Sequence, residues 1–222
     1  MSLYLSRLHL SRDPAVTALN ALLDPDDAGR RQDAHHRLLW SAFAGDPDAR
    51  RDFLWRAESG GRFWVLSARP PLGGPLFAPP EVRQFAPDLA AGDVLAFALR
   101  ANATRDRKGV GRVDVVMDAL HGVAKNDRAA QRMAVAQQAA GEWLAAQGAR
   151  NGFTPEALAV EDYSTMVLPD HRGQRAGQPK FGVLDMTGRL RVTDPAAFLA
   201  RLAAGFGRAR AFGCGLMLVR RA

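Results

Sequence analysis

The chain has 222 residues, of which 47% are hydrophobic, enough to bury a core in one large domain or two small ones. Its 30 lysines and arginines outnumber its 23 acidic residues, and the formal net charge of +7 favours a polyanionic partner. The single cysteine, Cys214, excludes an internal disulfide and a thiolate metal cluster. No segment approaches the roughly 18 apolar residues of a membrane span, and the N-terminus lacks a signal-peptide pattern. We therefore expect a cytoplasmic protein with no membrane partner.

Apolar periodicity defines the elements of the first half. In chain order they are a strand over 3–10, a helix over 28–44, one or two helical turns within 47–57 and a strand over 62–67. Asp26 and Asp27 stand where they can cap the long helix. Proline and glycine punctuate residues 69–80, and the pattern resets near residues 87–93. The reset predicts a domain boundary.

The second half has a fuller set of elements. They are a strand over 94–101, a charged loop over 106–111, a helix over 126–147, strands over 157–168 and 181–192, a helix over 194–204 and a strand over 216–220. Strand, helix, strand, strand, helix, strand is the ferredoxin-like order that RNA-recognition modules also use. The first half resembles a degraded copy of it. The prediction is an α+β fold of two tandem ferredoxin-like (RRM-like) domains with antiparallel sheets, residues 1–88 and 92–222.

A glycine-rich segment precedes the last predicted strand. Glycine lets backbone N–H groups approach a ligand closely, and arginines beside it add positive charge, so the segment is suited to phosphate. The candidate RNA-binding residues here are Gly205, Gly207, Arg208, Arg210, Gly213 and Gly215. The order helix, loop, strand differs from that of mononucleotide and dinucleotide fingerprints, which need a strand before the glycines.

Two further basic segments are candidates for RNA contact. The long connection over residues 169–180 carries Arg172, Arg175 and Lys180, and long loops are often functional. Such a protrusion could straddle the phosphates that rim the deep groove of an RNA hairpin. Arg100 and Arg105 follow the end of a strand and suit phosphate contact and solvation equally well.

Histidine is the remaining residue type with catalytic potential. His36 shares a helix face with Leu39, Trp40 and Phe43, a setting that by itself is typical of a hydrogen-bonded core histidine. Adjacent His35 points about 100° away on a helix, and no histidine pair has metal-ligand spacing. We expect neither a metal nor another cofactor.

Four stretches, in this order and spacing, resemble the CRISPR-associated endoribonucleases that process repeat RNA, of the CasE type in type I-E systems. They are Leu3-Tyr-Leu-Ser-Arg-Leu8, His36-Arg-Leu-Leu-Trp40, Leu99-Arg-Ala-Asn102, and Gly205-Phe-Gly through Gly213-Cys-Gly-Leu216. The resemblance implies two tandem ferredoxin-like domains and metal-independent RNA cleavage. It also implies a repeat stem-loop RNA and the other subunits of a type I-E surveillance complex as partners.

The resemblance also implies catalytic residues. His36 matches the family's catalytic histidine, and Lys180 matches a basic residue that often lies eight positions before a glycine, here Gly188. Arg37 is a further candidate for stabilising charge on the phosphate. Asp33 stands where many members have a tyrosine, and Tyr4 could take that role only if its strand runs beside the helix.

Cleavage without a metal needs an aligned 2′-hydroxyl, a proton donor or acceptor, and positive charge on the phosphate. The expected products carry a 2′,3′-cyclic phosphate and a 5′-hydroxyl. Two alternatives remain open. One is a non-catalytic RNA-binding subunit, in which Asp33 signals a decayed site, and the other is a general basic nucleic-acid binder with a steep salt dependence.

Overall fold

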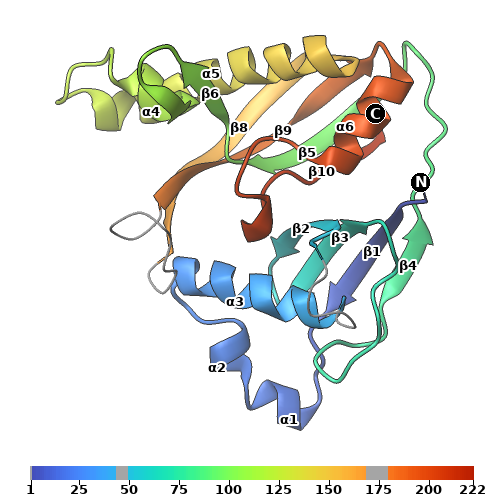
Figure 1. The fold of residues 1–222 in the computed structure, drawn as a ribbon. Helices are drawn as coiled ribbons and strands as arrows, with labels where there is room; N and C mark the ends of the chain where they lie inside the picture. The colour runs from blue at the N-terminus through green and yellow to red at the C-terminus, as the bar shows by residue number, and fades with distance from the viewer. Residues whose placement is uncertain (1, 44–49, 169–179) are drawn as a thin grey trace. The chain divides into compact units, whose positions relative to one another are not determined.

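A computed structural model describes residues 2–43, 50–168 and 180–222 of the chain (Figure 1). The chain divides into two compact units. The first comprises Met1–Pro87, Met166–Lys180 and Arg210–Gly213, and the second comprises Asp88–Thr165, Phe181–Ala209 and Cys214–Ala222. The limits 1–88 and 92–222 for two independently folding domains stay a prediction.

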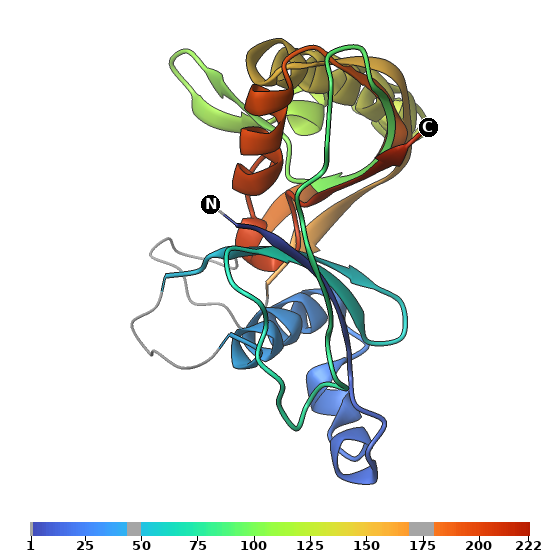
Figure 2. The ribbon, with the colours of Figure 1, turned by 90° about the vertical axis from the view of Figure 1, so that its right-hand side faces the viewer.

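The first unit is an antiparallel sheet with a helix packed on one face (Figures 1 and 2). Its strands are β1 (Tyr4–His9), β2 (Phe53–Glu58), β3 (Arg62–Ser67) and β4 (Glu81–Gln84), in the order β2-β3-β1-β4. Its helices are α1 (Pro14–Thr17), α2 (Asn20–Leu23) and α3 (Ala28–Ser41). Leu39 of α3 packs against Leu8, Trp55 and Phe63 of the sheet, and all four side chains are fully buried. Burial of these large side chains is the main stabilising force of this unit.

Within its described residues, the first unit lacks one element of a complete ferredoxin-like domain, and one of its elements was predicted wrongly. Residues 68–80, between β3 and β4, run without a helix, so the second helix of the motif is missing. The helical turns predicted within residues 47–57 are wrong for the described part, because residues 53–57 belong to β2. Phe53 and Trp55 alternate toward the core beneath α3, and pairing with β3 satisfies the backbone.

The second unit has the complete motif. Its elements are β5 (Val94–Ala101), β6 (Thr104–Arg107), β7 (Gly111–Asp114), α4 (Val115–Leu120), α5 (Arg128–Asn151), β8 (Phe153–Val167), β9 (Lys180–Val192), α6 (Pro195–Ala204) and β10 (Met217–Arg221). The sheet order β10-β5-β9-β8 is the ferredoxin-like order, and β5 is antiparallel to both its neighbours. Alternate residues of β5 are buried, so one face of its sheet meets the core. The predicted fold class is confirmed.

The charged loop predicted over residues 106–111 lies within a β-hairpin, which is followed by a short helix. β6 and β7 pair in register from Thr104↔Asp114 to Arg107↔Gly111, and α4 follows at once. Asp114 caps α4, since its Oδ1 accepts from the backbone N–H groups of Val116 and Met117, both at 3.0 Å.

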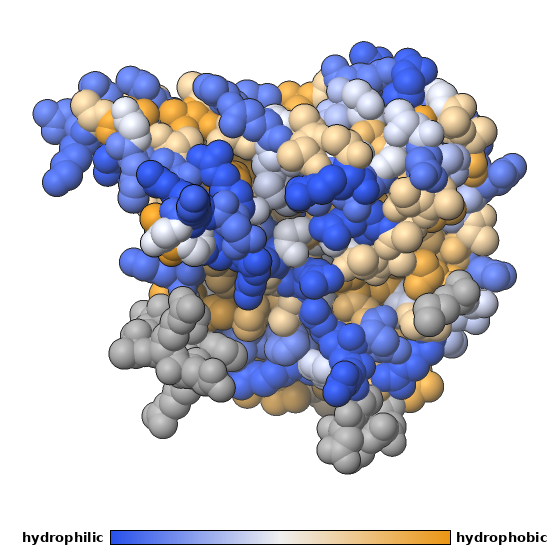
Figure 3. Space-filling view, turned by 45° about the horizontal axis from the view of Figure 1, so that its top comes forward, coloured by the Kyte–Doolittle hydropathy of each residue, from blue (hydrophilic) through white to orange (hydrophobic). Residues whose placement is uncertain are grey.

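Hydrophilic residues cover much of the face drawn in Figure 3. None of the helices within the described residues combines the length and the apolar character needed to cross a membrane.

Candidate active site and RNA-contacting residues

The two adjacent histidines of α3 occupy different environments. His35 is 3% exposed, and its ring stands edge-on to Phe63 at 4.8 Å and to Trp55 at 6.2 Å between centroids. Its Nε2 lies 3.0 Å from Oδ1 of Asp24. Burial lowers the pKa of His35, although the charge and hydrogen bond of Asp24 act in the opposite direction. The core histidine of this helix is therefore His35.

His36 is only partly buried, and it lies against a short 3₁₀ helix, η1 (Arg210–Phe212). Its ring and that of Phe212 have centroids 5.5 Å apart and planes inclined by 52°. η1 belongs to the same compact unit as α3, although it comes from the far end of the sequence. We call the place where His36 meets η1 the α3–η1 site.

Specific contacts hold η1 against the helix and the edge strand β2. The indole N–H of Trp55 donates to the carbonyl of Ala211 at 3.1 Å, and the side-chain amide of Gln32 donates to the carbonyl of Phe212. Gly213 has φ +68°, and a Cβ there would lie 2.6 Å from Nε2 of Gln32 and 3.0 Å from the Trp55 ring. Only glycine fits at this position without displacement of its neighbours.

Two arginines bring positive charge to the same unit. Arg51 precedes β2, and Arg210 begins η1, which contacts β2. Burial and then the charge of Arg210 lower the pKa of Arg51, so the two guanidinium groups are close enough to repel each other. Such a pair is suited to an anion. Arg51 is missing from the sequence-based candidates because nothing local distinguishes it from its neighbour Arg50.

Arg37, on the exposed side of α3, forms an ion pair with Asp33. Its Nη2 lies 3.1 Å from Oδ2 of Asp33, one helical turn earlier. The side chain of Arg37 is 72% exposed, so the pair contributes only about 0.3–0.5 kcal/mol. A phosphate could therefore draw Arg37 away from Asp33.

Tyr4 and Lys180 also group with the first unit. Tyr4 is on the same side of β1 as the fully buried Leu8, which is the side that α3 covers. In the sheet order, β3 separates β1 from β2, which contacts η1. Lys180 is exposed at the first position of β9.

In the second unit, Arg100 forms an internal ion pair. Its Nε and Nη2 donate to the carboxylate of Asp185, its direct partner in the β5–β9 register, at 2.7 to 3.1 Å. Burial acts to lower the pKa of Arg100, but the hydrogen bonds and charge of Asp185 outweigh it and raise that pKa. An RNA phosphate would have to compete with this carboxylate.

The other arginine candidate after β5, Arg105, contacts α4. Its Nε donates to Oδ2 of Asp118 at 2.8 Å, and Nη1 of Arg107 donates to Oδ1 of the same carboxylate at 2.6 Å. Both arginine side chains are about half exposed, so each keeps a surface for an anion.

The glycine-rich segment uses much of its backbone for internal contacts. The N–H groups of Phe206, Arg208 and Gly215 donate to the carbonyls of Gly215, Asn102 and Arg100 at 2.9, 3.0 and 2.7 Å. A Cβ at Gly207 would lie 2.4 Å from the carbonyl oxygen of Asn102. Close packing against β5 explains the glycine at 207, and binding of phosphate by Gly205, Gly207, Gly213 and Gly215 stays a prediction. Arg172 and Arg175 lie outside the described residues.

Comparison with known proteins identifies the family. No curated protein matches the chain in sequence. A solved structure of the CRISPR endoribonuclease Cse3 bound to a 19-nucleotide RNA shares 21% identity, with a TM-score of 0.66 over 99% of this chain and 100% of that one. The CRISPR-associated protein Cas6e from Escherichia coli K-12 shares 21% identity, with a TM-score of 0.53 and the same coverage of both chains. A chain of a CRISPR RNA-guided surveillance complex shares 17%, with a TM-score of 0.61, again over 99% and 100%.

At these identities, the similar structures support the fold that the strand order already indicates. The family model described as CRISPR associated protein matches residues 3–221. This chain therefore belongs to the family of CRISPR associated proteins.

Proposed function

We propose that this protein is a metal-independent endoribonuclease that cuts CRISPR precursor RNA at the base of the repeat stem-loop. The 2′-hydroxyl attacks its own phosphate and gives 2′,3′-cyclic phosphate and 5′-hydroxyl ends. The protein then retains the mature guide RNA within a surveillance complex. Family membership supports this proposal, as do the structural likeness to an RNA-bound CRISPR endoribonuclease and to a chain of a surveillance complex.

The position of His36 is the observation that carries the proposal. Of the two adjacent histidines, His35 is buried and bonded to Asp24, whereas His36 is partly exposed beside η1. An imidazole exchanges protons near neutral pH. In this site it donates a proton to the 5′-oxygen leaving group, a role that contributes about 10²- to 10⁴-fold to the rate.

The positive charge near His36 suits stabilisation of the phosphate during cleavage. The phosphorane formed by 2′-hydroxyl attack carries more negative charge than the ground state, and fixed cations stabilise it selectively. Arg51 and Arg210 supply that charge within the unit of α3. Arg37 and Lys180 add to it once RNA is bound, and Tyr4 is the candidate for the second proton-transfer group.

Binding of the stem-loop depends on basic residues outside the α3–η1 site. Arg100, Arg105 and Arg208 in the second unit are proposed phosphate contacts, together with Arg172 and Arg175. Their ion pairs with Asp185 and Asp118 position Arg100 and Arg105, and the exposed half of Arg105 remains available for RNA.

A non-catalytic RNA-binding subunit is the second candidate, and Asp33 favours it. The carboxylate of Asp33 stands one turn before Arg37 and adds negative charge to a helix that would face the scissile phosphate. A decayed site would retain the fold and bind RNA without cutting it.

The two candidates differ in one assay. Purified protein and the variants His36→Ala and His121→Ala are incubated with end-labelled cognate repeat RNA in excess EDTA, and product size and end chemistry are resolved on a gel. His121 is exposed at the C-terminal cap of α4 and serves as the matched control.

We expect one cut with a cyclic phosphate end for the wild type and His121→Ala, and a rate lower by about 10²- to 10⁴-fold for His36→Ala with unchanged RNA affinity. Tight binding without cleavage by all three proteins would favour the non-catalytic subunit. Cleavage that stops in EDTA would contradict the metal-independent mechanism.

A further inference from the structure

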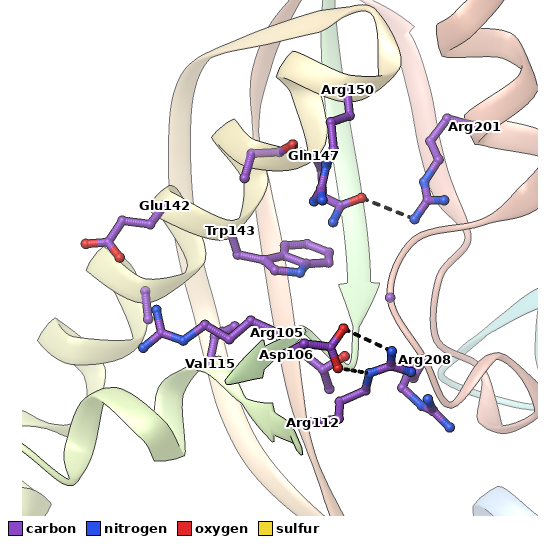
Figure 4. A pocket seen from close by; sticks show the side chains of 14 residues that line it. Arg105, Asp106, Arg112, Val115, Glu142, Trp143, Gln147, Arg150, Arg201 and Arg208 are labelled. Carbon is purple, nitrogen blue, oxygen red and sulfur yellow. Dashed lines mark hydrogen bonds and ion pairs between the residues drawn. The ribbon is translucent and has the colours of Figure 1, made fainter. Parts of the chain in front are cut away.

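The second unit contains a cavity of about 560 Å³ whose lining is rich in arginine (Figure 4). Its walls come from the β6–β7 hairpin, α5, α6 and the glycine-rich segment. The five arginines are Arg105, Arg112, Arg150, Arg201 and Arg208, and the two carboxylates are Asp106 and Glu142. The lining also includes Trp143, Gln147 and Gly207. We call this the hairpin cavity.

Most of these arginines are already positioned by short contacts. Arg201 donates to Oε1 of Gln147 at 3.1 Å, and Arg150 donates to the carbonyl of Ala146 at 3.0 Å. Arg105 is held by Asp118, outside the cavity. A ligand that binds between them therefore meets groups whose side-chain freedom is already reduced, which lowers the entropic cost of binding.

One carboxylate of the cavity occupies the position at Arg112 where the phosphate of a ligand could bind. Asp106 accepts from Nε and Nη2 of Arg112, both at 3.1 Å, in a bidentate pair (Figure 4). Hydrogen bonds from Arg112 lower the pKa of Asp106, and the charge of Arg208 adds to the effect. Arg112 thus holds this carboxylate in the bidentate geometry that arginine also uses to bind phosphate, and Arg208 lines the same cavity.

The pair between Asp106 and Arg112 is exchangeable. The side chains of Asp106 and Arg112 are 73% and 48% exposed, and exposed ion pairs contribute little to stability. A phosphodiester that displaces Asp106 would gain Arg112 and Arg208 together, while the fold loses almost nothing. The Arg100–Asp185 pair is much less exposed, so the hairpin cavity is the more accessible anion site.

The cavity includes an arginine that lies close to η1 in the sequence. Arg208 lines the cavity, and Arg210 begins η1 two residues later. An extended chain spans at most about 7 Å over two residues. Arg208 and Arg210 are therefore close along the chain, and a ligand with repeated phosphates, such as RNA, suits this run of arginines better than a single acidic group does.

We propose that the hairpin cavity binds phosphodiester groups of the bound RNA other than the one that is cut, with Arg112 and Arg208 as the phosphate ligands and Asp106 as the group that phosphate displaces. This inference rests on the proposed function, because it takes the RNA to be the substrate of the α3–η1 site. Asp106 also gives the cavity selectivity, since a weakly charged ligand cannot compete with it for Arg112.

The test measures equilibrium binding of labelled repeat RNA over a range of salt concentrations, in the His36→Ala background so that the RNA stays intact. The variants are Arg112→Gln, Arg208→Gln and Asp106→Asn. Arg191→Gln is the matched control, because Arg191 has the same 48% side-chain exposure as Arg112 and also pairs with a carboxylate, that of Glu156. Each variant is compared on full-length RNA and on RNA shortened stepwise from either end.

We expect Arg112→Gln and Arg208→Gln each to weaken binding about three- to tenfold and to reduce the slope of log K against log salt by about 0.7 to 0.9. Asp106→Asn should strengthen binding, and Arg191→Gln should leave it unchanged. The differences should disappear on RNA too short to reach the cavity.

Three results would overturn the proposal. Unchanged RNA affinity in all variants would show that the cavity does not bind phosphate. Weaker binding by Asp106→Asn would show that the Asp106–Arg112 ion pair only maintains the shape of the hairpin. Unchanged RNA affinity with lost association with other subunits would assign the cavity to an acidic protein surface. If the wild type binds RNA without cutting it, the proposed function fails. The salt dependence of binding still tests whether the cavity binds RNA phosphates.

Discussion

Replacement of Gly213 by alanine tests whether the docking of η1 creates the site around His36. Gly213 has φ +68°, in the left-handed region, and lies between the side chains of Gln32 and Trp55. Gly60 is the matched control, since it has φ +72° but a Cβ there would meet nothing within 4 Å. The two substitutions share the backbone strain and differ in the contact.

The expected magnitudes follow from these geometries. An alanine in the left-handed region costs roughly 1–2 kcal/mol, which both variants incur. At position 213 the Cβ would also lie 3.0 Å from the fully buried ring of Trp55, and overpacking of this kind costs about 1–3 kcal/mol. If η1 instead leaves its place, the hydrogen bonds to the carbonyls of Ala211 and Phe212 are lost, at about 1 kcal/mol each.

The assay combines unfolding with single-turnover cleavage. Gly213→Ala should be less stable than Gly60→Ala by about 1–3 kcal/mol, or about 2–12 °C in Tm for a chain of this size. It should also cut more slowly, because Phe212 and Arg210 move away from His36. Equal stability and equal cleavage in the two variants would refute the argument that packing at Gly213 positions the site.

Three further predictions concern single charges. Burial lowers the pKa of His35, so below about pH 6.5 the unfolded chain binds a proton that the folded chain does not. The free energy of unfolding should therefore fall as the pH drops below about 6.5, by up to about 1.4 kcal/mol per pH unit. Urea unfolding of His35→Gln at several pH values should lack this slope. Arg100→Gln leaves Asp185 without its bidentate partner and should lower the free energy of unfolding by about 1–2 kcal/mol, measured by urea unfolding; an unchanged value would show that the pair is only a surface contact. Asp33→Asn removes a negative charge and releases Arg37, so single-turnover cleavage should become roughly two- to fivefold faster, whereas a slower reaction would give Asp33 a positive role in the mechanism.

Local patterns were sufficient to predict most of the elements. Alternation over residues 94–101 and helical spacing over 126–147 correspond to β5 and α5, and the order of the second half gave its topology. β2 was predicted wrongly, because its aromatic residues are buried by tertiary packing against α3, which no local pattern shows. The β6–β7 hairpin was missed because charged residues pair across it, and no hydrophobic alternation marks its strands in the sequence.

The site was harder to predict than the fold. Spacing alone placed His36 among core residues, yet the buried face of α3 is centred on His35, Leu38 and Leu39. The resemblance to the family selected His36, the less buried of the two histidines. No local pattern could reveal that Gln32 bonds to Phe212, 180 residues away, or that Arg51 lies near Arg210.

The distance along the sequence between α3 and η1 also bears on how the protein is made. Ribosomes add about 5–20 residues per second, and segments fold as they emerge, N-terminal parts first. The sheet of the first unit and α3 can therefore assemble while the partner of Gln32, 180 residues downstream, awaits synthesis for roughly 10–40 s. During that interval the nascent chain has His36 without Phe212 or Arg210. Completion of the site late in translation would delay RNA cleavage until the second unit, with its arginine-lined cavity, has been made.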